Sequence, residues 1–495
     1  MADRSENAQI GNFDLGDGVE LIGELKLAGP KTTLSLHSTE FFDPRSCPDG
    51  YIRGSLHDHS KVSLIGCIST EAGTLSTAEG KSHFATVFPH FVLSGRRHLA
   101  PQESAISCIH FTIDDATTIF YDFDAFGLVV DARPLIRQVV LSNKSDREIA
   151  IGSDPQILYF AGKREIITAN TPVGRVSANH SPSWSFPGPG GVQIRNKIRV
   201  SVEFADCARL DHAIDVVHLL RNYLGLLVGR PQVLSEIMVQ LKADKDEAEI
   251  LRLDWSWCPE RKELDQGRKP HPADVLMDPV RRPEEFCAVL TNWLDRQTSW
   301  QDARSRFFGC FEGQSIYNVD RLIAAANMFD ILPSSAIPKE VQLTSEMQEA
   351  KSNAQARFRK LAPSPERDSV LGALGRLGRP SLKRKVRFRT QVLLDAMPGR
   401  FPRLIPVLDL AIDCRNYLVH GGDAPFDLGA NTNALWFLAD SLEFVFATTD
   451  LIEAGWDMKA WDSHTSVSHP YGSFIRNYQA QVARFESLLR IPKSP

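Results

Sequence analysis

The feature that most constrains the fold of this chain is a change of hydrophobic periodicity at Ala208. Before it, apolar residues alternate in short segments such as Glu20–Leu27 and Tyr51–Leu56, which is typical of half-buried β-strands. After it, they recur every three or four positions in longer segments such as Leu210–Val228 and Pro402–His420, which is typical of amphipathic helices. The periodicity predicts an α+β multidomain chain, with a β-rich, sandwich- or barrel-like N-terminal domain followed by an all-α bundle.

Two successive hairpins are predicted near the N-terminus. Glu20–Leu27 and Thr32–His37 flank a Gly-Pro turn, and Tyr51–Leu56 and Lys61–Ile68 flank a polar turn. Each hairpin has an Ile and a Gly before a Leu in its first strand. The other predicted strands are Ser104–Ile113, Gly127–Val130, Val139–Leu141, Glu165–Thr168 and Lys197–Glu203.

The chain of 495 residues is long enough for two or three domains. We divide it into a β-rich domain at 1–205, a helical connecting region at 206–312, a helical bundle at 313–462 and a C-terminal helix and tail at 463–495. The predicted helices are Leu210–Val228, Ser235–Ala243, Glu284–Arg296, Asn318–Ile331, Thr344–Leu361, Arg367–Leu377, Leu382–Met397, Pro402–His420, Asn433–Ala454 and Tyr471–Leu489.

Composition favours a cytoplasmic protein. The eight cysteines include no CxxC pair, so free thiols in a reducing compartment are expected. The N-terminal segment has no apolar core of the kind a signal peptide needs. The most apolar run, Ala434–Ile452, carries Asp440, Glu443 and Asp450, so we expect a buried helix and no membrane crossing.

The net charge of −5 argues against a protein that coats nucleic acid non-specifically, but not against a local basic site. Seven of the fourteen residues in Arg376–Arg389 are basic and none is acidic. This run is either a track for an RNA backbone or a solvated, helix-capping charge run. The candidate RNA-binding residues are Lys383, Arg384, Arg387 and Arg389.

Arg415, Asn416 and His420 lie at the predicted end of Pro402–His420, just before Gly421. Cleavage of RNA without metal needs a base or acid that works near neutral pH, which histidine supplies. It also needs a cation that stabilises charge on the phosphate oxygens, which arginine supplies. The amide of Asn416 could orient either partner. The alternative interpretation is a polar cap that complements the helix dipole.

Spacing alone does not single out this trio. Arg415 and His420 are five positions apart, about 140° around a regular helix, so a second copy of the helix is one way to complete the site. The pairs Arg53–His59 and Arg175–His180 have similar spacing. Both fall in predicted hairpin or loop contexts without an amide after the arginine, so we discount them.

The text RNYLVH, from Arg415 to His420, resembles the arginine–histidine motif of HEPN domains. The hairpin text around Ile22–Leu25 and Gly54–Leu56 is similar to the N-terminal domain of the ApeA class of abortive-infection, anti-phage proteins. The resemblance implies a β-rich sensor or regulator, a C-terminal HEPN bundle and metal-independent endoribonuclease activity. It assigns His420 as general acid/base, Arg415 as the phosphate-stabilising cation and Asn416 as their support.

The resemblance also implies RNA as substrate, with tRNA as one candidate, a phage-derived trigger and a homodimer or higher homo-oligomer. No cofactor is expected, since the chain has no GxxxxGK[ST] motif. A metal site at His57–His59 is disfavoured because no ligand set completes it. Two other hypotheses stay open: a non-catalytic HEPN-like module that binds nucleotide, RNA or a partner protein, and an antitoxin-like partner of another enzyme.

Overall fold

The computed structural model describes residues 8–16, 18, 20–45, 47–142, 150–185, 189–242, 248–258, 270–464 and 468–489. Residues 1–7, which begin the segment examined for a signal peptide, lie outside the described residues. Residues 490–495, which end the predicted C-terminal tail, also lie outside them. The chain forms two compact units. The first comprises residues 1–228, 232–263 and 277–287, and the second comprises residues 229–231, 264–276 and 288–495.

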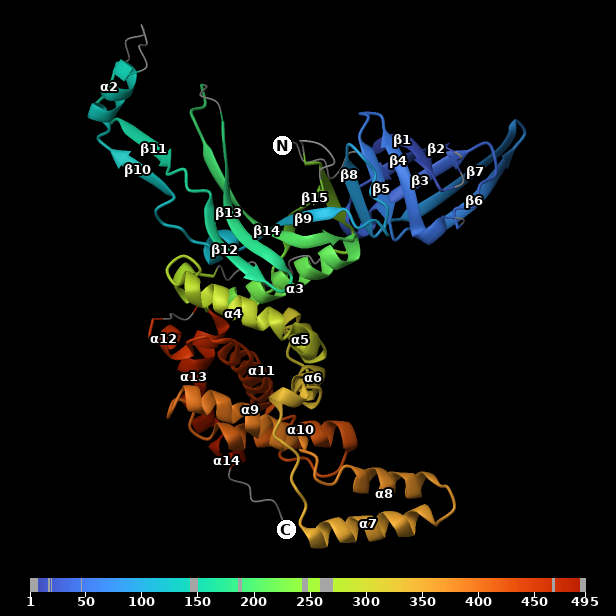
Figure 1. The fold of residues 1–495 in the computed structure, drawn as a ribbon, viewed down its shortest axis with the longest axis vertical. Coiled ribbons are helices and arrows are strands. Elements are labelled where there is room, and N and C mark those ends of the chain that lie inside the picture. Colours follow the sequence, from blue (N-terminus) through green and yellow to red (C-terminus); the bar gives the residue numbers. More distant parts are fainter. Residues whose placement is uncertain are drawn as a thin grey trace. The chain divides into compact units, whose positions relative to one another are not determined.

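An antiparallel sheet of fourteen strands dominates the first unit (Figure 1), which confirms the predicted β-rich domain. Its order is β12-β13-β14-β9-β15-β16-β8-β5-β4-β1-β2-β3-β7-β6, and β10 (Phe126–Val130) pairs separately with β11 (Gln156–Phe160). The strands of the large sheet are β1 (Gln9–Asp14), β2 (Glu20–Lys26), β3 (Thr33–Ser38), β4 (Tyr51–Leu56), β5 (Lys61–Ile65), β6 (Ile68–Thr77), β7 (Gly80–Phe88), β8 (Phe91–Gly95), β9 (Ile106–Ile113), β12 (Glu165–Thr171), β13 (Gly174–Trp184), β14 (Ile194–Ala208), β15 (Leu234–Leu241) and β16 (Ile250–Trp255).

The two predicted hairpins are β2–β3 and β4–β5, and β1 lies between them in the sheet. Phe13 of β1 is fully buried at the centre of this part of the core. A Cβ atom at Gly23 would lie 2.8 Å from the Phe13 ring, and one at Gly54 would lie 2.6 Å from it. The glycine that recurs in both hairpins therefore leaves the space that the aromatic ring fills.

Two sequence predictions in this unit are wrong. Ser235–Ala243 is not a helix, because Leu234–Leu241 is strand β15, paired with β9 and β16. A register shift between Leu234 and Glu236 puts the buried Leu234 and Ile237 three residues apart, and Ile237, Val239 and Leu241 then alternate. The first step interrupts the period of two that marks a strand. Val139–Leu141 is not a strand but the end of α2 (Arg133–Ser142).

Strands β15 and β16 belong to residues 206–312, so this segment contributes to the large sheet as well as providing helices. The predicted helix Leu210–Val228 is α3, with the same bounds, and a further short helix is α1 (Ala116–Ile119). Helix α5 (Gln297–Glu312) has no counterpart among the predicted helices.

The second unit is helical, which confirms the predicted all-α bundle (Figure 1). Helices α9, α10 and α11 pack together, and α6 contacts all three. Helices α7 and α8 pack on each other as a hairpin that extends from the other helices of this unit. The helices from α4 onward are α4 (Pro283–Asp295), α5, α6 (Val319–Asp330), α7 (Ser345–Arg359), α8 (Pro365–Gly375), α9 (Leu382–Ala396), α10 (Leu404–His420), α11 (Thr432–Ala454), α12 (Met458–Asp462), α13 (Pro470–Arg484) and α14 (Glu486–Leu489).

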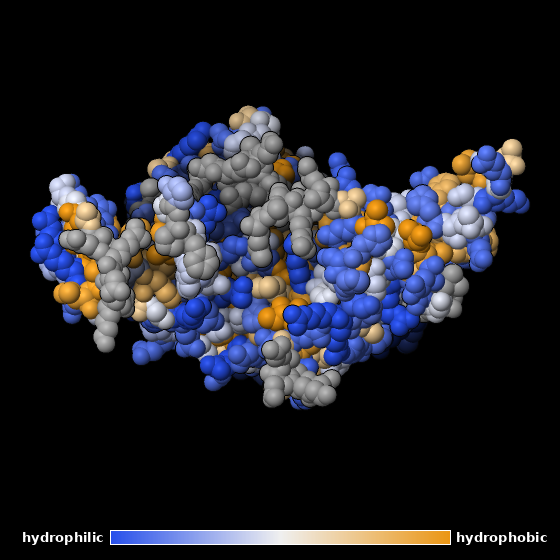
Figure 2. Space-filling view, turned by 90° about the horizontal axis from the view of Figure 1, so that it is seen from above, coloured by the Kyte–Doolittle hydropathy of each residue, from blue (hydrophilic) through white to orange (hydrophobic). Residues whose placement is uncertain are grey.

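The central helix α11 is apolar but holds charges in pairs. Asp450 is buried, and its carboxylate accepts hydrogen bonds from Trp293 Nε1 at 2.9 Å, Arg304 Nε at 2.9 Å and Arg296 Nη2 at 2.6 Å. These bonds compensate for the loss of water around the buried carboxylate. Within the described ranges, every helix is too short or too polar to cross a membrane. Hydrophobic residues on the face seen in Figure 2 occur in small groups among hydrophilic ones.

Candidate functional site

Helix α10 brings the predicted trio to the surface of the second unit. Its buried side, which includes Leu408, Ala411 and Ile412, packs in the bundle core. The helix ends at His420 because Gly421 adopts φ 76°, and the Gly421 N–H donates to the Tyr417 carbonyl at 2.8 Å. The last turn is therefore the exposed, terminated end of an otherwise buried helix.

The guanidinium of Arg415 contacts both other members of the trio. Arg415 Nη1 lies 3.2 Å from His420 Nε2 and 3.2 Å from the Asn416 Oδ1 that accepts from it. An arginine can only donate, so His420 accepts this bond at Nε2 with its ring proton on Nδ1. The Arg415 side chain is 15% exposed, whereas Asn416 and His420 are both exposed. The guanidinium of Arg415 and the imidazole of His420 thus meet at the surface of the second unit.

A fourth residue, Asn327 of α6, fixes the arginine. Its Oδ1 accepts from Arg415 Nε at 3.1 Å and from Arg415 Nη2 at 2.8 Å. Asp330, one turn further along α6, has Oδ2 4.0 Å from Arg415 Nη2. Sequence reasoning missed both residues. The available signal was Asn327 itself, a polar residue flanked by Ala326 and Met328 in the apolar part of α6.

Cys414 precedes the arginine but takes no part in this surface. It is fully buried, and burial raises the pKa of its thiol to about 12. A thiol in this state is protonated at neutral pH and is not a nucleophile. The candidate functional groups at the end of α10 are therefore the guanidinium, the amide and the imidazole.

The four candidate RNA-binding residues of the basic run lie on α9, and they differ in burial and in their partners. Lys383 Nζ lies 2.7 Å from Asp413, and Arg387 Nη2 lies 2.6 Å from Asp409, so two ion pairs link α9 to α10. Hydrogen bonding to that carboxylate raises the pKa of Arg387. Arg384 is half-buried and has no carboxylate partner within the described ranges.

Arg389 differs from the rest of the run because it is buried in the bundle. Its Nε donates to Thr449 Oγ1 at 3.2 Å and its Nη1 donates to Glu453 at 2.5 Å. Only 1% of its side chain is exposed. A guanidinium in this position stabilises the packing of α9 on α11 and does not face a ligand at the surface.

The two pairs with similar spacing do not form such a site. Arg53 lies on β4, and its Nη2 forms an ion pair with Asp14 Oδ2 of β1 at 2.5 Å. His59 lies in the turn after β4 and has φ 65°. His180 is buried in β13, five positions from an arginine on the same strand. Odd separations on a strand place side chains on opposite faces, so Arg175 points away from it.

Comparison with known protein families agrees with this architecture. Residues 323–460 match the model of the Apea-like HEPN domain, and residues 12–293 match the model of ApeA N-terminal domain 1. The second unit thus carries a HEPN domain, the class of helical domain that this match shows. The chain belongs to the ApeA family. No curated protein and no solved structure matches it.

Proposed function

We propose that the HEPN domain of this protein is a metal-independent endoribonuclease whose active groups are Arg415, Asn416 and His420. The observation that carries the proposal is the 3.2 Å approach of Arg415 Nη1 to His420 Nε2 at an exposed helix end. The proposal is supported by the position of the trio within residues 323–460, which match a domain family generally associated with RNA cleavage. These groups supply both an acid/base and an anion-stabilising cation.

Each side chain has a distinct role in this proposal. When RNA binds, the phosphate replaces His420 as the acceptor of the Arg415 Nη1 bond, and the freed Nε2 takes the proton of the ribose 2′-hydroxyl as that oxygen attacks the adjacent phosphorus. Arg415 donates to the non-bridging phosphate oxygens, where negative charge builds. Asn416 accepts from Arg415 and so helps to orient its guanidinium.

Attack by the 2′-oxygen breaks the bond between phosphorus and the 5′-oxygen. The departing 5′-oxygen takes a proton from a second acid, and we propose that a second copy of His420 in a homodimer provides it. The products are a 2′,3′-cyclic phosphate and a 5′-hydroxyl. The dimer is part of the proposal because HEPN domains commonly act in pairs.

RNA would approach along Lys383, Arg384 and Arg387, with Arg384 making the strongest contact because no carboxylate neutralises it within the described ranges. Arg387, whose side chain is half-exposed, would exchange its ion pair with α10 for a phosphate at small cost because exposed ion pairs contribute little stability. Lys383 would do the same from a less exposed pair with Asp413. Arg389 is left out, since its guanidinium is buried.

The exposure of His420 favours catalysis over the alternative of a non-catalytic binding module. In a non-catalytic module we would expect His420 to be buried and bonded to the backbone, whereas His420 is exposed and contacts Arg415. We further propose that the protein acts in the cytoplasm in abortive infection, with residues 1–205 sensing or regulating and the HEPN bundle at 313–462 cleaving RNA, tRNA being one candidate.

The chemistry of the cut ends tests the proposal. Purified full-length protein is incubated with total RNA in EDTA, and 3′ ends are ligated by a method that requires a 2′,3′-cyclic phosphate. Wild type is expected to generate new cyclic-phosphate ends, R415A is not, and the matched surface control H59A is expected to behave like wild type. New ends that carry a 3′-hydroxyl would contradict the mechanism.

A further inference from the structure

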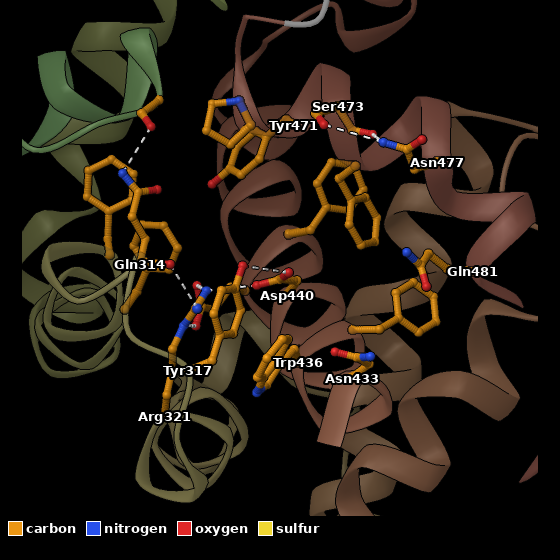
Figure 3. A pocket seen from close by; sticks show the side chains of 18 of the residues that line it. Gln314, Tyr317, Arg321, Asn433, Trp436, Asp440, Tyr471, Ser473, Asn477 and Gln481 are labelled. Atoms are coloured by element: carbon orange, nitrogen blue, oxygen red, sulfur yellow. Dashed lines mark hydrogen bonds and ion pairs between the residues drawn. The ribbon is translucent and has the colours of Figure 1, made fainter. Parts of the chain in front are cut away.

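A second candidate site lies in the second unit, in a cavity between α5, α6, α11 and α13 (Figure 3). Its volume is about 380 Å³, within the size range of small-molecule sites. None of the proposed catalytic residues lines it. The polar and charged side chains that line it include Gln314, Tyr317, Arg321, Asn433, Asp440, Glu443, Ser473, Asn477, Gln481 and Arg484.

Aromatic rings form the walls of this cavity. Tyr317 and Trp436 lie face to face at a centroid distance of 5.0 Å and a tilt of 33°, and each is 40% exposed. Phe474 lies 4.4 Å from Phe444 further along the wall. Half-exposed aromatic faces such as that of Trp436 favour a planar ring stacked against them.

The polar side chains on the α6 side pair with one another and are acidic overall, and each Asp440 oxygen keeps one lone pair that can accept a further hydrogen bond. Arg321 donates to Glu443 at 2.7 and 2.9 Å and to Asp440 at 2.8 Å, so one guanidinium faces two carboxylates. Tyr317 Oη donates to the other Asp440 oxygen at 3.2 Å. Burial raises the pKa of the Asp440 and Glu443 carboxyls, because removing water destabilises their charged form. This side of the cavity disfavours a phosphate and suits a neutral ligand that offers N–H donors, whereas Arg484, the other arginine in the lining, is exposed to solvent.

Tyr471 provides an independent observation that a ligand is missing. The residue is 9% exposed, and its hydroxyl has no hydrogen-bond partner among the described residues. Figure 3 shows this hydroxyl pointing into the space bounded by Gln314, Tyr317 and Asp440. Buried hydroxyls are nearly always paired, so an unpaired one that faces a cavity marks a position where a ligand atom would bind.

We propose that this cavity binds a neutral, planar heteroaromatic molecule with N–H donors, of the nucleobase or nucleoside class. The ring stacks on Trp436, its N–H groups donate to Asp440, and its ring nitrogen or carbonyl oxygen accepts from the Tyr471 hydroxyl. The amide of Gln481 at the α13 side can donate or accept and adapts to the substituents of the ring.

Two tyrosine variants give a matched test. Tyr471→Phe removes a hydroxyl that has no partner among the described residues, so the protein is expected to keep its melting temperature. Tyr478→Phe, which lies on the same helix but outside the cavity lining, removes a hydroxyl that donates to the Pro402 carbonyl at 3.0 Å. That change is expected to lower the melting temperature and to leave ligand binding unchanged.

The probes are guanosine, adenosine, cytidine and uridine, added to the full-length protein in a thermal-shift assay and in isothermal titration calorimetry. At least one nucleoside is expected to bind with a Kd of about 0.1 mM or lower. Y471F is expected to weaken that binding by about tenfold, because a hydrogen bond from a buried hydroxyl is lost. W436A is expected to weaken it at least as much through loss of stacking.

Three results would overturn the proposal. One is that none of the four nucleosides binds at about 1 mM, the weak end of specific affinities. Another is that Y471F or W436A binds as tightly as wild type, or that Y478F loses as much affinity as Y471F. The third is that a short RNA binds in this cavity while no free nucleoside does. RNA cleavage is not a readout here, so failure of this proposal and failure of the nuclease proposal are separable.

Discussion

Arg415 Nη1 lies 3.2 Å from His420 Nε2, although the two residues are five positions apart on α10. Five positions correspond to about 140° around a regular helix, so the two Cβ atoms point in different directions. The length of the arginine side chain closes the gap, and Asn327 holds the guanidinium from the side of α6. The pair therefore meets within a single chain, and a second copy is not required for this contact.

Asn327→Ala is expected to lower the rate of RNA cleavage by roughly 100-fold, because a displaced catalytic group costs about that much. The substitution removes the acceptor of two bonds from Arg415. Cleavage of a defined RNA should be measured at saturating and at low substrate concentration. We expect the maximal rate to fall more than the affinity for substrate.

Gln391→Ala is the control for this prediction, since the Gln391 amide is exposed and donates to Asp395 on the same helix. If N327A and Q391A cleaved at the same rate, Asn327 would have no positioning role.

Arg415→Lys is expected to be nearly as inactive as Arg415→Ala. The planar fork of Arg415 reaches Asn327, Asn416 and His420 at once, and a single ammonium cannot reproduce this geometry. We expect a loss of about 10²-fold or more, as for removal of an oxyanion-stabilising donor. A lysine variant with wild-type turnover would show that only the charge matters.

Arg389 and Arg384 are expected to respond in opposite ways to substitution by alanine. R389A removes the buried partner of Glu453 and Thr449, while Glu453 keeps its ion pair with Arg296, so the change should cost about 1.5–3 kcal/mol of the free energy of unfolding. R384A should change the free energy of unfolding by less than about 0.5 kcal/mol. It should reduce the slope of the logarithm of the RNA-binding constant against the logarithm of salt concentration by about 1, because one phosphate contact is lost. Denaturant unfolding and binding across salt concentrations measure the two effects. Equal stabilities for both variants would contradict the placement of Arg389.

Acidification is expected to destabilise the first unit. Burial lowers the pKa of His98, His110 and His180 below the ordinary value near 6.5. Between the lowered and the ordinary pKa, the unfolded chain binds more protons than the folded unit, so stability rises with pH and is lost as the pH falls below about 6.5. Hydrogen exchange of the amides in β9 and β14 from pH 7.5 to 5 would follow this loss.

H110Q should make that pH dependence shallower, because its amide stays neutral while it can still bond Ser201 and Gln240, the partners of His110. H37Q replaces an exposed histidine of β3 and should leave the dependence unchanged. An identical pH profile for H110Q and wild type would refute the role of His110.

The sequence was sufficient to predict the order of β-rich and helical parts because periodicity is a local property. It placed helix α10 to within two residues at its start and at His420 at its end. It failed at β15, where a register shift interrupts the alternation of buried positions at the start of the strand, because a register shift cannot be detected from a hydrophobic pattern. It also failed to find β15 and β16 as members of the large sheet, since strand pairing depends on residues far apart in the chain.

The site was predictable in part for the same reason. Arg415, Asn416 and His420 are close in sequence, so a motif could reveal them. Asn327 is 88 positions away from Arg415 and joins it only through the packing of α6 on α10. The burial of Arg389 follows from the face that α9 turns toward α11, which a count of basic residues cannot show. The cavity at Tyr471 is likewise made by helices distant in sequence.

The most direct test of the account compares wild-type protein and H420A on the same RNA in the presence of EDTA. His420 is exposed and bonded only to Arg415 within the described ranges, so its truncation should leave the fold intact, as circular dichroism would verify. The account predicts cleavage by wild type in EDTA and a loss of at least about 10²-fold in H420A, the scale of general acid–base catalysis. Cleavage by H420A at the wild-type rate would contradict it.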